Sequence, residues 1–147
     1  MGALPDAAQN GPPAQNGLVA LKSAFPVKET LDRLAHLVES KGLAVFCRID
    51  HAANAVSAGL ELRPTEVLIF GNAKGGTPLM QAAQTIGIDL PLKALAWEDA
   101  DGTVWLTCND PSWIARRHGI GPEVQQPVAH MADILADLTA RAANGKT

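Results

Sequence analysis

The chain has 147 residues, of which 47% are hydrophobic and 18% charged, and its formal net charge is -3. This size and composition predict one domain with one core, and the charge argues against a nucleic-acid partner because no broad positive field is available to hold phosphates. The sequence has no apolar run of the roughly 20 residues that cross a bilayer and no secretory leader pattern, so we expect a cytoplasmic protein without membrane attachment.

Composition changes at both ends of the chain. Residues 1–16 are rich in proline, glycine and asparagine and have almost no large apolar side chain, which predicts a flexible N-terminal tail. Residues 142–147 are expected to fray as a flexible C-terminal end. The folded domain is therefore expected over residues 17–141.

The first predicted elements are a strand, a helix and a second strand. Alternating apolar residues predict the strands over residues 17–24 and 43–50. Between them, Pro26 opens a helix that ends at Gly42. One stripe of this helix is apolar and consists of Val27, Leu31, Leu34, Ala35 and Val38. One face of the second strand is expected to carry Leu43, Val45, Cys47 and Ile49.

The middle of the chain predicts a short helix over residues 52–58 and a strand over residues 66–71. This strand is apolar on both faces, as expected for a central strand covered on two sides. A glycine-rich stretch follows. The next helix is expected to have Thr77 as its N-cap and Pro78 at its first helical position, and to end at Gly87.

The last third predicts a β-hairpin and two helices. Strands over residues 92–98 and 103–109 are joined by a short polar connection. Pro111 then opens a short helix that ends at Gly119, and an amphipathic helix is expected from about residue 128 to residue 141.

These elements follow the order β-α-β-β-α-β-β-α, which predicts an α+β fold with one mainly antiparallel sheet and helices packed on one face. The other face is expected to carry Phe46, Leu68 or Phe70, and Trp105, and is then too apolar to remain in water. Together with the unpaired edge of the first strand, this face predicts a homodimer.

Five short sequence motifs lie between Leu18 and Ile120. They are Arg48–His51, Phe70–Met80, Ile88–Lys93, Trp97–Asp99 and Arg117–Gly119. In their order and number, these motifs resemble those of the domain-of-unknown-function-302 (DUF302) family. The resemblance implies a fold similar to the TATA-binding-protein-like α+β fold and a homodimer, and it brings no biochemical activity. Ala73 departs from the family, which often has proline at this position.

The glycine-rich stretch Gly71 to Gly76 leads from a strand into a helix and is the first candidate site. Amide groups at the helix N-terminus, together with the ammonium group of Lys74, could hold a phosphate or a carboxylate. The candidate ligand-binding residues here are Asn72, Lys74, Gly75, Gly76 and Thr77. Nucleotide hydrolysis is not expected, because a P-loop needs lysine and then serine or threonine after its last glycine. The favoured alternative is a tight turn that ends in a helix cap.

Asp50 and His51 adjoin at the end of a predicted strand, where a carboxylate could orient an imidazole for acid or base catalysis. Neighbours on a strand point to opposite faces. The favoured alternative is therefore that Asp50 caps the short helix that follows. The resemblance keeps His51 as a candidate for both catalysis and ligand binding.

Charged residues also gather around the predicted hairpin. Lys93 and Glu98 could hold a ligand or act in catalysis beside His51. The favoured alternative is that these charges protect a sheet edge from aggregation, with Asp110 as the N-cap of the next helix.

No metal site is expected, because His51 and His118 lack the spacing of metal ligands on one element. His130 falls on a polar helix face and is expected to be solvated. Cys47 and Cys108 lie far apart and alternate with core residues, so we expect two buried free thiols without catalytic chemistry. The sequence identifies no cofactor.

The favoured function is a dimeric domain that binds a small, anionic molecule near the glycine-rich stretch without catalysis. One alternative is a small enzyme that uses His51 as acid or base with Glu98 or Lys93. Another is a structural or protein-interaction module. A pocket that gathers His51, Lys74 and Glu98 would favour binding or catalysis over the module.

Overall fold

The computed structural model describes residues 16–145. The tail expected over residues 1–16 lies outside the described residues except for Asn16, and so do the last two residues of the expected C-terminal end. Within the described part of the chain, every helix is too short or too polar to cross a membrane.

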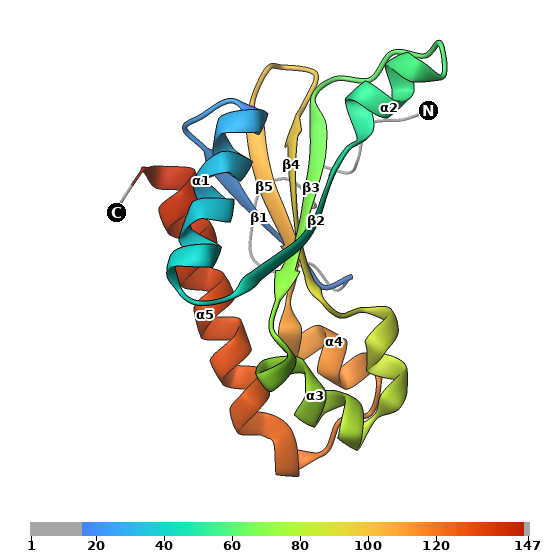
Figure 1. Ribbon diagram of the computed structural model, residues 1–147, viewed down its shortest axis with the longest axis vertical. Helices are drawn as coiled ribbons and strands as arrows, with labels where there is room; N and C mark the ends of the chain where they lie inside the picture. The colour runs from blue at the N-terminus through green and yellow to red at the C-terminus, as the bar shows by residue number, and fades with distance from the viewer. Residues whose placement is uncertain (1–15, 146–147) are drawn as a thin grey trace.

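A five-stranded antiparallel sheet forms the centre of the fold, with the strand order β1-β5-β4-β3-β2 (Figure 1). Its strands are β1 (Leu18–Ser23), β2 (Ala44–Asp50), β3 (Thr65–Gly71), β4 (Leu92–Glu98) and β5 (Val104–Asn109). The α+β class, the antiparallel sheet and the order of the main elements are confirmed.

Two long helices pack side by side on one face of the sheet (Figure 1). They are α1 (Val27–Ser40) and α5 (Gln125–Asn144). The shorter helices lie near the two ends of the sheet and are α2 (His51–Ser57), α3 (Ala73–Ala82) and α4 (Pro111–Arg117), with 3-10 turns η2 (Gln84–Ile88) and η3 (Pro122–Val124).

The main core lies between the sheet and the pair α1 and α5. The apolar stripe of α1 is buried as expected, with Leu31, Leu34 and Val38 fully inaccessible. A second, smaller core joins α3, η2, α4 and the first half of α5, and includes Leu79 and Ile114. This second core holds the helices at the lower end of the sheet in Figure 1.

Only some of the residues expected on the outer face of the sheet lie on that face. Leu68 and Phe70 are both fully buried in the main core beneath the helices. Trp105 does alternate with the core residue Leu106, but only 9% of it is exposed. It stacks on Trp97 with ring centroids 6.5 Å apart, and its indole N–H donates to Asp99 at 2.9 Å.

A β-bulge at Phe46 explains why the second strand does not follow the predicted alternation of faces. Val45 pairs with Phe70 and Cys47 with Ile69, so Phe46 is the extra residue between two paired positions. The bulge reverses the faces on which later residues lie, and the strict alternation predicted for this strand is therefore wrong. Both cysteines are free, but the expectation that Cys47 is buried is also wrong, because it is exposed.

Helix α3 begins earlier than expected. Its N-cap is Asn72, whose side-chain Oδ1 accepts a hydrogen bond from the Gly75 amide at 2.8 Å. Thr77 is therefore not the cap, and Pro78 lies inside the helix. Asparagine is as good an N-cap as threonine, and the glycine-rich stretch is the first turn of this helix.

The last helix extends three residues beyond the expected domain boundary at residue 141, to Asn144. Ala142 and Ala143 are fully buried. The carbonyl of Ala143 accepts from the Ala24 amide at 2.9 Å, and the carbonyl of Ala142 accepts from Arg33 Nε at 3.0 Å. These bonds satisfy carbonyls that the end of a helix otherwise leaves open.

Candidate ligand pocket

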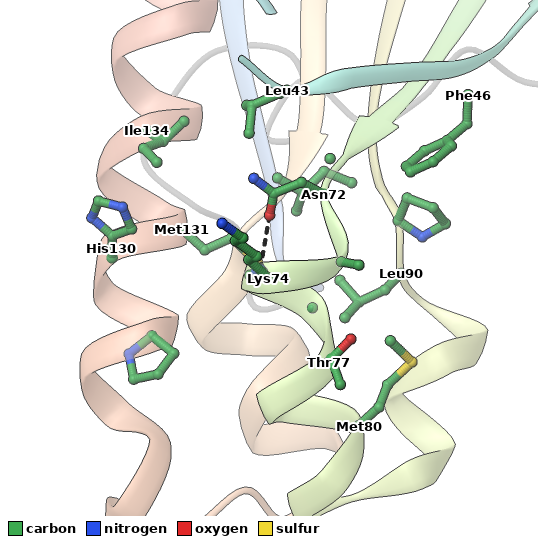
Figure 2. A pocket seen from close by; sticks show the side chains of 17 residues that line it. Leu43, Phe46, Asn72, Lys74, Thr77, Met80, Leu90, His130, Met131 and Ile134 are labelled. Carbon is green, nitrogen blue, oxygen red and sulfur yellow. Dashed lines mark hydrogen bonds between the residues drawn. The ribbon is translucent and has the colours of Figure 1, made fainter. Parts of the chain in front are cut away.

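A pocket of about 540 Å³ lies where the start of α3 meets α5. Figure 2 shows α5 on one side of it, and Phe46 and Leu90 on the other, with the first turn of α3 between them. Its volume falls within the range of about 300–1,000 Å³ that is usual for small-molecule sites.

The lining is mainly apolar, with a few polar groups. Apolar side chains of the lining are Leu43, Phe46, Ala73, Met80, Leu90, Pro91, Leu92, Pro127, Met131 and Ile134. Polar side chains come from Asn72, Lys74, Thr77 and His130. Specific sites for small molecules commonly combine such an apolar wall with a few polar groups that orient the ligand.

The pocket contains part of the candidate site expected from the sequence. Each ligand-binding candidate in the glycine-rich stretch lines it: Asn72, Lys74, Gly75, Gly76 and Thr77. His51, Lys93 and Glu98 are not among its lining residues. The arrangement of His51, Lys74 and Glu98 around one pocket is thus not present.

His51 begins α2 and is exposed. Its neighbour Asp50 is the N-cap of that helix, since the Asp50 side chain accepts from the Ala53 amide at 2.8 Å. The helix-cap interpretation of Asp50 is therefore confirmed. Glu98 ends β4, and its backbone carbonyl accepts a hydrogen bond from Arg63.

Lys93 supports one wall of the pocket from outside. Its ammonium group donates to the backbone carbonyl of Asp89 at 3.2 Å and to that of Pro91 at 3.1 Å. These bonds fix the turn that carries Leu90 and Pro91, two residues of the pocket lining. Lys93 thus positions the wall.

A cluster of polar side chains ties the same turn to α4. His118 Nε2 lies 2.5 Å from Asp89 Oδ2, and His118 Nδ1 lies 2.9 Å from the hydroxyl of Thr85. Arg117 also donates to both carboxylate oxygens of Asp89, at 3.0 and 3.1 Å. Because Asp89 immediately precedes Leu90, the cluster fixes the position of the pocket wall.

Charge at the pocket is positive although the chain is acidic. Lys74 is the charged residue of the lining, whereas the formal net charge of the chain is -3. Among the first backbone N–H groups of α3, that of Gly75 donates to Asn72, whereas those of Ala73 and Lys74 precede the intrahelical hydrogen bonds, at the positive end of the helix dipole. The mouth of the pocket therefore favours an anion over a cation.

Two glycines leave room in the pocket. A Cβ atom at Gly76 would lie 3.6 Å from Leu90 Cδ1 and 3.6 Å from Met80 Cε, which are ordinary contacts between lining residues. A Cβ atom at Gly75 would come within 3.1 Å of the Oδ1 of Asn72, the cap of α3. Gly76→Ala therefore fits as a test of the pocket, whereas a Cβ atom at Gly75 would disturb the helix cap.

Several lining residues were not expected as site residues from the sequence. His130, Met131 and Ile134 come from α5, where Met131 fitted the core stripe and His130 the polar face. Phe46 comes from the bulge of β2, and 56% of it is exposed. No local pattern places these residues beside α3.

Within residues 16–145, no group of three or more His, Cys, Asp or Glu side chains is arranged to hold a metal ion.

A family model described as "Domain of unknown function DUF302" matches residues 19–138. The fold, an antiparallel sheet with two helices on one face, also resembles the crystal structure of an uncharacterized conserved DUF302 protein from Bacillus stearothermophilus. That likeness has a TM-score of 0.76 at 18% identity and covers 86% of this chain and 98% of the other. This chain belongs to the DUF302 family.

Two Brucella proteins are more similar to this chain in sequence than the Bacillus stearothermophilus protein is. The chain is 56% identical over 106 residues to proteins named fluoride-specific ion channel FluC 1 from Brucella suis and from Brucella abortus. Each match covers 72% of this chain, but only 42% of the first protein and 39% of the second. The chain thus spans about two fifths of the length of these relatives.

Proposed function

We propose that this domain binds a small, anionic molecule in the pocket between α3 and α5 and does not transform it. The observation that carries the proposal is the pocket itself, in which Lys74 and the N-terminal turn of α3 meet a mainly apolar wall. The absence of His51, Lys93 and Glu98 from its lining favours binding over the acid–base enzyme.

Fluorescence titration with anilinonaphthalene sulfonate, a probe that combines an apolar ring system with one negative charge, tests this function. We expect one saturable site in the native protein. Gly76→Ala should weaken binding severalfold because its methyl group occupies part of the pocket, whereas Ala82→Val on an exposed position of the same helix should not. Equal affinities for both variants would reject the pocket as the site and favour a structural or protein-interaction module.

We also propose that two copies of the domain form a homodimer through the sheet face opposite α1 and α5. A partly exposed apolar row crosses β2, β3 and β4 on that face. It consists of the paired residues Ile49, Val67 and Leu95. Two-fold pairing would bury each row against its copy. Val56 of α2 and Leu60 in the segment after that helix are further exposed apolar residues, with 70% and 66% of their area accessible.

A second candidate function is a role beside a fluoride channel, which we infer from the 56% identity to part of the Brucella proteins. If the domain senses fluoride, the positive mouth of the pocket at Lys74 is the part that could attract it. Sodium fluoride should then raise the melting temperature more than sodium chloride at equal ionic strength, and Lys74→Ala should remove the difference. Equal effects of the two salts would reject this candidate.

A further inference from the structure

We infer that the ligand of the pocket is a single-chain amphiphile, with an alkyl chain and one anionic head group such as a carboxylate. This inference rests on the proposed binding function and names its ligand class. The chain would lie along the apolar wall, and the head group would lie at Lys74 and the first turn of α3.

The apolar wall favours an alkyl chain over a compact polar anion. Leu90, Met131 and Ile134 contribute aliphatic or thioether side chains from both sides of the pocket (Figure 2). A fully polar anion such as phosphate would pair with Lys74 but would leave the apolar wall in contact with water, whereas an alkyl chain would cover that wall. Methionine side chains are flexible and adapt to chains of varied shape.

Phe46 supports the same ligand class. The ring comes from the bulge of β2 and lines the pocket, and 56% of the residue is exposed. An exposed aromatic side chain at the edge of an apolar pocket gains buried area when an apolar chain enters beside it.

The polar side chains of the pocket come from two neighbouring elements, α3 with its cap and α5. Lys74 and Thr77 are exposed and belong to the first two turns of α3, and His130 is exposed on the neighbouring α5. The lining has no carboxylate that would repel an anionic head. Charge complementarity with Lys74 therefore favours a monoanion whose chain extends along the apolar wall.

Isothermal titration of the full chain with hexanoate, octanoate and decanoate tests the alkyl part. Each added pair of methylene groups should tighten binding about tenfold until the pocket is full. Phe46→Ala should weaken decanoate binding severalfold, whereas Leu62→Ala, at a similarly exposed position outside the pocket, should not. Affinity that does not depend on chain length would overturn the inference.

Comparison of decanoate with decanol tests the anionic part. Decanoate should bind more tightly, and Lys74→Ala should reduce that preference about two- to fivefold, as expected for an exposed ion pair. Lys22→Ala, which removes an exposed lysine on β1, should leave it unchanged. Equal binding of both compounds to the native protein would overturn the charge assignment. If anilinonaphthalene sulfonate binds in the pocket and decanoate does not, the proposed binding function stands and the amphiphile is wrong.

Discussion

His118 Nε2 lies 2.5 Å from Asp89 Oδ2, and this contact joins the end of α4 to the turn that forms one wall of the pocket. Only 8% of the His118 side chain and 16% of the Asp89 side chain are exposed. Asp89 and His118 belong to two separate sequence motifs, Ile88–Lys93 and Arg117–Gly119. Their contact gives these two motifs one structural role, which is to hold Leu90 and Pro91 in place.

His118→Ala should therefore act on the pocket without contacting a ligand. Loss of a largely buried hydrogen bond partner should lower the free energy of unfolding by about 1–3 kcal/mol. The affinity for anilinonaphthalene sulfonate should fall severalfold at a temperature where the variant is folded, because the Leu90 wall loses its support. Arg116→Ala, at an exposed position of the same helix, is the control. Unchanged probe affinity in the folded His118→Ala protein would contradict this positioning role.

Arg48 should be a major contributor to stability at the junction of α1, β2 and β3. Its guanidinium donates to Glu66, which is 8% exposed, and to Asp32 Oδ1 at 2.7 Å. Arg48→Met should lower the free energy of unfolding by about 2–3 kcal/mol, because it leaves the buried Glu66 carboxylate without its partner. Lys28→Ala, which removes an exposed partner of Asp32, should cost under about 0.5 kcal/mol. Urea denaturation of the two variants measures the difference, and equal costs would show that the Glu66 contact adds nothing.

The two cysteines should differ in reactivity. Cys47 is exposed, whereas burial, with a smaller contribution from Asp110, raises the pKa of Cys108 to about 11. Thiol titration at about pH 8 should therefore detect one fast thiol in the native protein and a second after unfolding. Cys47→Ser should remove the fast phase alone. Two equally fast thiols in the native protein would contradict the burial of Cys108.

The raised pKa of Cys108 also predicts how stability depends on pH. The folded protein favours the protonated thiol, so this contribution is fully present below the ordinary thiol pKa of 9.0 and is lost as pH rises toward about 11. Urea denaturation across this interval should show a decline of about 2–3 kcal/mol that is absent from Cys108→Ala. Parallel declines in both proteins would assign the loss to other groups.

The proposed dimer depends on the apolar row of the open sheet face. Val67→Lys should shift the protein from dimer to monomer in light scattering at micromolar concentration, since each two-fold interface would contain two buried lysines. Ile88→Lys, at a residue of η2 that is 75% exposed, should leave the mass unchanged. Circular dichroism shows whether the variant remains folded. A native protein that scatters as a monomer would reject the dimer.

Local sequence patterns determined most of the secondary structure. The apolar stripe of α1, from Val27 to Val38, repeats at helical spacing and is buried as that spacing predicts. The strand predicted over residues 92–98 has the bounds of β4. Such patterns are readable because helix and strand periodicities depend on residues that are close in sequence. The resemblance also led to the correct family.

Tertiary structure alone decided how the pocket is built. The bulge at Phe46 depends on pairing with β3, and a single extra residue reverses the faces predicted by alternation. Met131 and Ile134 line the same pocket as the first turn of α3, more than 50 residues away in sequence, because of the packing of α5. The sequence identified Lys74, and packing between distant elements determined that an apolar pocket, rather than His51 and Glu98, lies beside it.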